Sequence, residues 1–107
     1  MYKIEFYVPH THVESVKEAL FESGAGKIGD YDYCCWQIEG QGQFRPLSGS
    51  DPHVGKVGKL EILKEWKVEL VCDGNSIKRA LKALIRAHPY KEPAYNIIKI
   101  PDNSAFL

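Results

Sequence analysis

The hydrophobic pattern of this chain switches between a period of two and a helical period, and the order of these switches constrains the fold more than any other feature. Apolar and polar residues alternate from Tyr2 to Val8, which predicts a strand with one buried side. From Val13 to Phe21 the apolar residues recur at helical spacing. Thr11-His12-Val13-Glu14 has the spacing of a capping box, and Gly24 and Gly26 are suited to end this helix.

The middle of the chain predicts strands on either side of a long irregular segment. Residues Tyr31 to Glu39 are aromatic-rich, which is typical of a strand. Glycines and prolines then recur from Gly40 to Gly58 and predict a long loop, with room for a short strand at Gln43 to Leu47. Apolar residues take alternate positions from Leu60 to Cys72, so this segment is either one long bent strand or two short ones.

A second helix and a last strand complete the pattern. The helix is predicted by an apolar stripe at helical spacing, which consists of Ile77, Ala80, Leu81, Leu84 and Ile85. Its N-cap residue is expected to be Asn75 or Ser76. The final strand is expected from Tyr95 to Ile100, and Asp102 to Leu107 form a tail.

This order of elements favours one fold class. For two helices and about four main strands, the economical solution is an α+β fold with an antiparallel sheet and both helices on one face, the ferredoxin-like (βαββαβ) arrangement. The long glycine-rich loop, or an extra hairpin within it, is added to that plan. The other face of the sheet would carry Tyr7, Tyr31, Tyr33, Cys35 and Leu63, which is too apolar for free solvent. We therefore expect another subunit to cover that face.

Length and composition restrict the class of protein. At 107 residues the chain is expected to form one domain, residues 1–107. Its 14 basic and 14 acidic side chains balance, so no net field favours nucleic acid or an anionic membrane. No apolar run approaches the roughly 20 residues that span a bilayer, and no signal peptide is expected. Three cysteines, two of them adjacent, disfavour a disulfide framework and fit a cytoplasmic protein.

The segment from His88 to Ile97 has more chemical character than a connection between a helix and a strand requires. Prolines within it stiffen the backbone and end the helix by about His88. The candidate site residues of this segment are His88, Tyr90, Glu92 and Tyr95. They could bind a small ligand, hold a divalent metal ion through His88 and Glu92, or form a rigid turn whose tyrosines pack in a subunit interface.

Three further groups of residues are secondary candidates. Phe44 and Arg45 lie in the glycine-rich loop, and Arg45 could pair with a carboxylate or phosphate, although a plain surface arginine is the ordinary alternative. His10 and His12 could be a second metal pair or two exposed polar residues at a helix start. Cys34-Cys35 lacks the two-residue gap of a zinc clasp, so burial of these thiols is expected.

Several segments together resemble one particular module. They are Gly24 to Tyr31, Cys34, Gly40 to Leu47, Gly55, Gly58, Glu61 and His88 to Tyr95. Their combination is similar to the CutA-like middle domain inserted in YqfO-type members of the Ngg1-interacting-factor-three-like dinuclear-metal family, which also occurs as a stand-alone chain. The resemblance covers essentially the whole sequence. The chain departs from the family at Lys91, where a second acidic residue is usual, and at Asn96, where Asp is common, so a cation site built on those carboxylates would be weakened.

The resemblance implies a ferredoxin-like fold related to CutA and the PII signalling proteins, and assembly into homotrimers. The family's two-metal site lies in flanking domains that this sequence lacks, so the resemblance does not imply metal-dependent hydrolysis here. It implies a regulatory or ligand-sensing module instead.

The expected function combines this resemblance with the candidate residues. It is a non-enzymatic oligomeric module that binds a small ligand or metal ion at subunit junctions, through His88, Tyr90, Glu92 and Tyr95, with Phe44 and Arg45 closing over them. One alternative is a structural or protein-interaction domain that uses the same residues for packing. The alternative with least support is a small hydrolase in which His88 and Glu92 act as acid and base.

Overall fold

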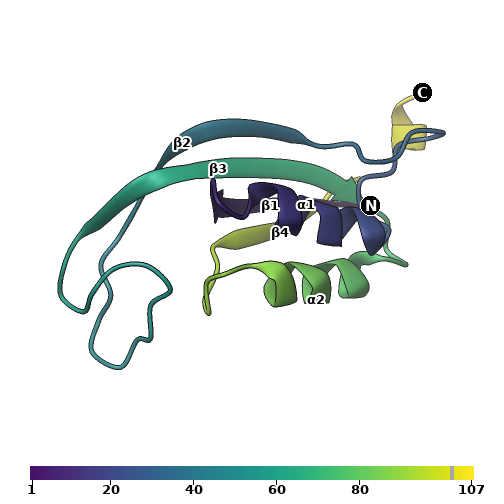
Figure 1. Cartoon of the computed structure of the whole chain (residues 1–107). Helices are drawn as coiled ribbons and strands as arrows, with labels where there is room; N and C mark the ends of the chain where they lie inside the picture. Colours follow the sequence, from purple (N-terminus) through teal and green to yellow (C-terminus); the bar gives the residue numbers. More distant parts are fainter. Residues whose placement is uncertain (102) are drawn as a thin grey trace.

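Two helices cover one face of a four-stranded antiparallel sheet in the computed structural model, which describes residues 1–101 and 103–107 (Figure 1). The strands lie in the order β2-β3-β1-β4, and each neighbouring pair is antiparallel. The elements are β1 (Tyr2–Pro9), α1 (Val13–Glu22), β2 (Trp36–Phe44), β3 (Glu61–Cys72), α2 (Ile77–Ala87), β4 (Tyr95–Lys99) and the 3₁₀ helix η1 (Asn103–Phe106). The predicted ferredoxin-like α+β class is confirmed. Asp102, at the start of the predicted tail, lies outside the described residues.

The core lies between the sheet and the helices. In β1 the predicted alternation holds, because Ile4, Phe6 and Val8 are fully buried while the residues between them are partly exposed. These side chains belong to one apolar cluster with Leu20 of α1 and Leu84 of α2. Since successive side chains of a strand point to opposite faces, this cluster assigns one face of the sheet to the helices.

The two ends of α1 differ in how well the sequence predicts them. The predicted capping box is wrong: the N-cap residue is His12, no side chain caps the helix, and the Thr11 hydroxyl instead lies 2.8 Å from Nδ1 of His12. The predicted glycine stop is confirmed, since Gly24 has φ +104° and its N–H donates to the Phe21 carbonyl. A further bond from the Ala25 N–H to the Leu20 carbonyl completes a Schellman motif, which places glycine where a left-handed residue is needed.

Helix α2 follows its predicted stripe with one exception. Ser76 is the N-cap residue, as one of the two alternatives predicted, although its hydroxyl accepts a hydrogen bond from Arg79 and does not cap the backbone. Ala80 and Leu84 are buried, but the predicted stripe member Ile85 is 47% exposed. The predicted five-residue stripe extends further around the helix than the surface that the sheet and α1 cover, so Ile85 remains exposed.

The predicted second strand begins too early. Residues 31–35 lie outside the sheet because Tyr33 has a left-handed φ of +57° and the Cys34 N–H donates to the Gly26 carbonyl, which curls this segment back. β2 starts at Trp36 and continues through two glycines to Phe44, where a loop was expected. It does so because β3 is a single strand of 12 residues, and its residues 61–69 pair with every residue of β2.

The irregular segment therefore covers residues 45–60, which we call the 45–60 loop. It connects β2 to β3, and this β2–β3 hairpin extends beyond the helices, as the left of Figure 1 shows. The molecule measures 51 × 22 × 21 Å. From the end of the hairpin the loop bends back toward the connection between α2 and β4 (Figure 1). The 45–60 loop and residues 90–94, which are far apart in sequence, therefore lie at the same end of the sheet.

The sheet face opposite the helices is mixed, because ion pairs among Lys3, Glu5, Lys67 and Glu69 cross its centre between exposed apolar residues of the two edge strands. It also differs from the predicted face in its residues. Tyr33 packs on Phe21 of α1, and Cys35 lies against the core, so the strand shift removes both from the open face. Trp36 and Ile38 take their place, with 59% and 51% of their surfaces exposed.

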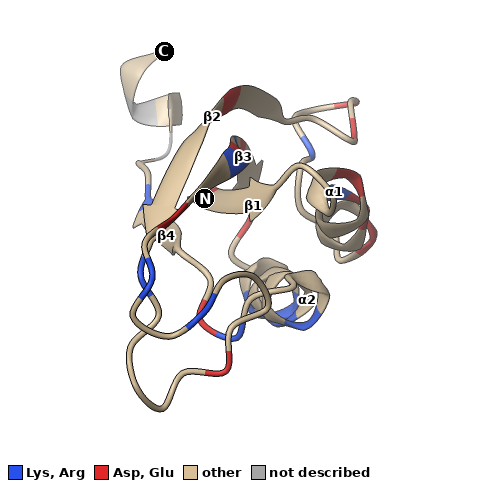
Figure 2. Ribbon diagram, turned by 60° about the vertical axis from the view of Figure 1, so that its left-hand side comes forward, with Lys and Arg blue, Asp and Glu red and all other residues tan. Residues whose placement is uncertain are grey.

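The outer faces of the helices are charged, with acidic residues on α1 and basic residues on α2, as Figure 2 shows. No helix in the described part of the chain is long and apolar enough to cross a bilayer.

Candidate functional site

His88 lies at the point where α2 stops and the chain turns toward β4. It is the C-cap residue of α2 and has an extended ψ of 135°, as expected for a residue before proline. The residue is 5% exposed, and Nε2 lies 2.7 Å from the carbonyl oxygen of Tyr7 on β1. Its Nδ1 accepts a hydrogen bond of 3.0 Å from the Tyr90 N–H. Because a carbonyl only accepts and an amide N–H only donates, the ring must be the neutral tautomer with its proton on Nε2.

The environment of His88 maintains this neutral state. Burial lowers the pKa of His88 below its usual range, and the nearby imidazoles of His12 and His53 act in the same direction. The bond to the Tyr7 carbonyl opposes this shift but is outweighed. With both nitrogens engaged by the backbone, His88 fastens the segment after α2 to the edge of β1, next to the place where β4 begins.

Tyr90 is at the centre of a group of rings. Its ring centroid lies 5.0 Å from that of His88, 5.8 Å from that of Phe44 and 6.2 Å from that of His53. Its hydroxyl donates a 3.0 Å hydrogen bond to the Glu65 carboxylate on β3. Burial raises the pKa of the Tyr90 phenol, and the negative charges of Glu65 and Glu61 raise it further. The phenol therefore stays protonated and acts as a donor.

Glu65 owes its position to a glycine on the neighbouring strand. A Cβ atom at Gly42 would overlap the Glu65 carboxylate, so the side chain of Glu65 occupies the space that a larger residue at Gly42 would fill. Gly42 pairs with Leu63 and Gly40 pairs with Glu65 in the β2–β3 ladder. The sequence pattern did not single out Glu65 or Gly42, because their contact depends on a strand register that only the folded hairpin defines.

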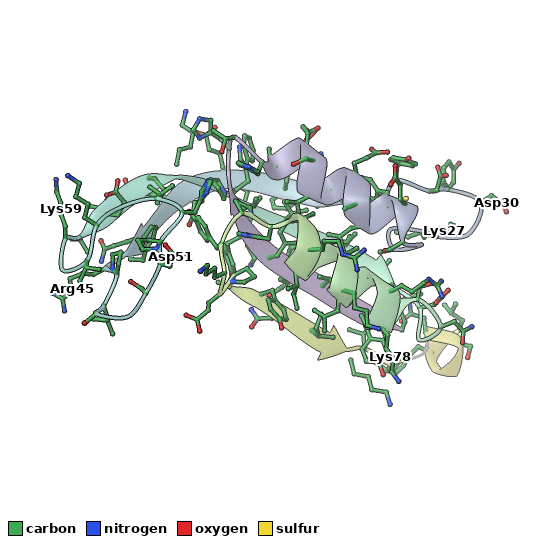
Figure 3. All side chains as sticks on the ribbon, turned by 60° about the horizontal axis from the view of Figure 1, so that its bottom comes forward. Lys27, Asp30, Arg45, Asp51, Lys59 and Lys78 are labelled. Atoms are coloured by element: carbon green, nitrogen blue, oxygen red, sulfur yellow. The ribbon has the colours of Figure 1, made fainter. Side chains whose placement is uncertain are left out.

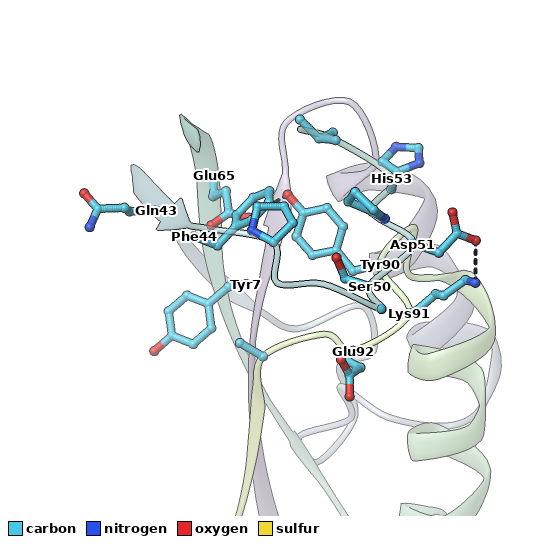
Figure 4. Close-up of a pocket in the computed structure, with 15 residues that line it drawn as sticks. Tyr7, Gln43, Phe44, Ser50, Asp51, His53, Glu65, Tyr90, Lys91 and Glu92 are labelled. Carbon is cyan, nitrogen blue, oxygen red and sulfur yellow. Dashed lines mark hydrogen bonds and ion pairs between the residues drawn. The ribbon is translucent and has the colours of Figure 1, made fainter. Parts of the chain in front are cut away.

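A cavity of about 490 Å³ opens between the 45–60 loop and residues 90–94 (Figure 4). Of the predicted site residues, Tyr90, Glu92 and Phe44 line it. Residues that were not predicted also line it, among them Glu65, His53 and Tyr7. Lys91 reaches Asp51 of the loop with an Nζ–Oδ2 distance of 2.6 Å, drawn as a dashed line in Figure 4. Lys91 holds the pKa of Asp51 below its usual range.

Other predicted residues lie elsewhere. Tyr95 on β4 packs against the core, and Arg45 is exposed near the outer end of the hairpin, where Figure 3 labels it close to Lys59. The ring of His88 packs against that of Tyr90, but His88 does not line the cavity. The structure therefore brings together three of the six predicted ligand-binding residues.

The secondary candidates are also separated. His10 is exposed, whereas His12 is partly buried and touches the ring of His53 edge-on at a centroid distance of 5.5 Å. All three cysteines are free, and burial raises the pKa of the Cys72 thiol. Across residues 1–101 and 103–107, no group of three or more His, Cys, Asp or Glu side chains is placed to hold a metal ion.

Comparisons with known proteins agree with this architecture. No family model matches the sequence. A protein of Halalkalibacterium halodurans named GTP cyclohydrolase 1 type 2 homolog is 40% identical over 107 residues, which is 100% of this chain and 29% of that protein. A Bacillus cereus protein related to NIF3 has a matching solved structure, with a TM-score of 0.80, 36% identity, and coverage of 94% of this chain and 26% of that one.

The fold alone has more distant neighbours. The crystal structure of CutA1 from Pyrococcus horikoshii matches with a TM-score of 0.67 at 19% identity, over 95% of this chain and 85% of that one. The arrangement of sheet and helices thus defines a CutA-like α+β domain.

The sequence relatives are more specific than the neighbours in fold. The chain is a homologue of one segment of the NIF3-related proteins, the Ngg1-interacting-factor-three-like family, as the resemblance predicted. It spans under a third of the length of these curated relatives, 29% in the Halalkalibacterium halodurans protein.

Proposed function

We propose that this chain is a non-enzymatic, oligomeric module that binds a small molecule in the cavity between the 45–60 loop and residues 90–94. The observation that carries the proposal is the cavity itself, about 490 Å³ in volume and walled by the rings of Tyr90 and Phe44. Small-molecule sites have volumes of roughly 300–1,000 Å³, apolar and aromatic walls, and a few placed polar groups. Glu92 and the Tyr90–Glu65 pair supply such groups.

The candidate residues divide into two roles in this proposal. Tyr90, Phe44 and Glu92 contact the ligand. His88 is a positioning residue, because its ring holds the backbone of Tyr90 and supports its side chain. A metal ion on His88 would have to displace either the Tyr7 carbonyl or the Tyr90 amide, so we favour a ligand held without metal coordination by His88. Tyr95 packs against the core at the start of β4, and Arg45 is exposed outside the cavity, so neither contacts the ligand within this chain.

The exposed sheet face supports the oligomeric part of the proposal. Trp36, Ile38 and Ile98 are each more than 40% exposed there, at 59%, 51% and 42%. β2 is an edge strand with one unpaired side, which is a ready site for association. We propose a homotrimer, as the resemblance to CutA-like domains implies. Three free thiols are consistent with a cytoplasmic location, which we also propose.

The same face favours a second candidate function, a structural or protein-interaction domain. In that case the open face of the sheet would bind a different protein and the cavity would have no ligand. The two functions differ in what happens when the cavity wall is changed. Only the first predicts loss of small-molecule binding while the assembly stays intact.

The test is a fragment screen by ligand-detected NMR against three proteins: wild type, Phe44→Ala and Leu47→Ala. Leu47 is the matched control, because it is a 68% exposed apolar residue of the same loop that does not line the cavity. We expect fragments that bind wild type and Leu47→Ala but not Phe44→Ala, with the solution mass unchanged. Absence of any hit on wild type, or hits that survive in Phe44→Ala, would contradict the proposal.

A further inference from the structure

We infer that the cavity selects a small organic cation, meaning an ammonium group with apolar substituents. This inference rests on the proposed function and adds the chemical class of the ligand. Two independent properties of the cavity carry it: the balance of charges around it and the aromatic surfaces that form its walls.

Carboxylates outnumber cationic groups in the lining. Three acidic residues line the cavity, Asp51, Glu65 and Glu92, whereas Lys91 is the one lysine or arginine among its described lining residues. Lys91 is bound to Asp51 at 2.6 Å, so these two charges offset each other. Glu65 and Glu92 form no ion pair within the described part of the chain.

This excess negative charge acts on the centre of the site. Glu65 accepts a hydrogen bond from Tyr90, and a phenol donor leaves the carboxylate its full charge. Glu65 and Glu61 both raise the pKa of Tyr90, which means that the potential at this ring is negative. An anionic ligand would be repelled here, and a cation would be attracted.

The walls suit a cation that carries apolar groups. The rings of Phe44 and Tyr90 lie 5.8 Å apart in an edge-on arrangement, and Tyr7 adds a third aromatic residue. Aromatic faces attract cations through their quadrupole, most strongly where the site is partly desolvated. Pro46 and Pro52 give the lining further apolar surface. A strongly hydrated inorganic ion would gain little from such walls, whereas an alkylammonium ion would bury its substituents against them.

Choline and its neutral carbon isostere 3,3-dimethylbutan-1-ol have the same shape and differ in charge, so together they test the inference. Both are titrated by NMR into the full chain at about pH 8, where exposed imidazoles are neutral. We expect choline to bind about tenfold more tightly than the isostere, the size of a cation–π and carboxylate contribution at a partly desolvated site. Equal binding of the two probes would overturn the inference.

Two variants distinguish the contribution of the carboxylate charge from that of the aromatic walls. In Glu92→Gln the affinity for choline should fall about two- to fivefold with that for the isostere unchanged, as expected for one exposed charge. Glu22→Gln is the matched control, since Glu22 is an exposed acidic residue of α1 away from the cavity. Phe44→Leu keeps an apolar wall but removes the ring, so the affinity for choline should fall more than the affinity for the isostere. An equal loss of affinity for both probes in Phe44→Leu would show that the ring does not contribute to cation selectivity.

The outcome also separates this inference from the proposed function. If choline fails to bind while neutral or acidic fragments bind in a Phe44-dependent way, the cavity is a ligand site but its cation selectivity is refuted. If neither choline nor any fragment binds, the proposed function itself is refuted.

Discussion

At the scale of single residues, Tyr90 connects the parts of the candidate site. Its backbone N–H is bound by His88, its hydroxyl donates to Glu65, and its ring contacts Phe44 at the end of β2. The sequence indicated Tyr90, because the prolines around it mark a rigid segment. Glu65 and Gly42 could not be identified in the same way, since Glu65 is 25 residues from Tyr90 and meets it only through the register of β3.

Gly42→Ala should release Glu65 from its position. A Cβ there overlaps the carboxylate, so Glu65 must move away and its bond with Tyr90 must break. We expect a loss of about 1 kcal/mol in the free energy of unfolding, the net value of such a hydrogen bond, measured by urea denaturation. Gly40→Ala is the matched control, because its Cβ would meet the Glu65 carbonyl oxygen at an ordinary 3.9 Å. Equal stabilities of the two variants would show that Gly42 does not position Glu65.

His88 should make the protein less stable as the pH falls below about 6.5. An unfolded histidine titrates near 6.5, and the pKa of His88 is lower in the folded protein. Between these two values the unfolded state binds more protons, so the free energy of unfolding is highest above pH 6.5 and falls as the pH drops toward the folded pKa. Urea unfolding at a series of pH values from about 7.5 to 5.5 measures this slope.

The variant His88→Gln tests the origin of that slope. Glutamine can still donate to the Tyr7 carbonyl and accept from the Tyr90 amide but does not titrate. Its pH slope should be clearly smaller than that of wild type. The same slope in both proteins would place the proton uptake at other residues.

At the scale of secondary structure, the elements were predictable wherever one periodicity continued without interruption. β1, α1, α2 and β4 follow from their apolar patterns to within one or two residues. The start of β2 could not be found, because Tyr31 and Tyr33 have strand-like character but lie in a turn that Gly26 and the left-handed Tyr33 enforce. Its end was missed because a long partner strand can hold glycines in a ladder that their own propensity disfavours.

The two faces of α2 can be separated by mutation. Leu84 is fully buried and Ile85 is 47% exposed, although both belong to the predicted apolar stripe. Leu84→Ala should lower the free energy of unfolding by about 2–5 kcal/mol, as buried leucines do, and Ile85→Ala by less than about 1 kcal/mol. Thermal or urea unfolding measures both. Similar losses would show that Ile85 is buried in solution, as it would be if another chain covered that side of α2.

At the scale of the whole molecule, the sheet separates two surfaces with different roles. One is covered by the helices. The other exposes Trp36 and Ile38 on β2 and Ile98 on β4, on either side of the charged residues of β1 and β3. The sequence predicted an apolar open face but named partly different residues, since the strand shift reverses which side chains point outward. The cavity lies at the end of this sheet, so the assembly and the ligand binding that we propose would involve neighbouring parts of the same hairpin.

Ile38→Lys should disrupt the assembly that we propose. Ile38 is a 51% exposed residue of the open face, and a lysine there would place a second positive charge beside Lys67 within the interface that we propose. Light scattering should give about three times the 12.1 kDa chain mass for wild type and a smaller value for the variant. Val57→Lys, at a 55% exposed position of the 45–60 loop, should leave the mass unchanged. A monomeric wild type would contradict the oligomeric part of the account.

Amide chemical-shift mapping with choline is the first experiment that we would do, because it shows whether the cavity beside Tyr90 is a ligand site. We expect the largest shifts in a ¹⁵N-labelled sample to cluster at Ser50 to Val54 and at Tyr90 to Glu92, on the two sides of the cavity. Shifts confined to the open face around Trp36 and Ile38, or no shifts with choline or with any fragment, would contradict the proposed ligand site.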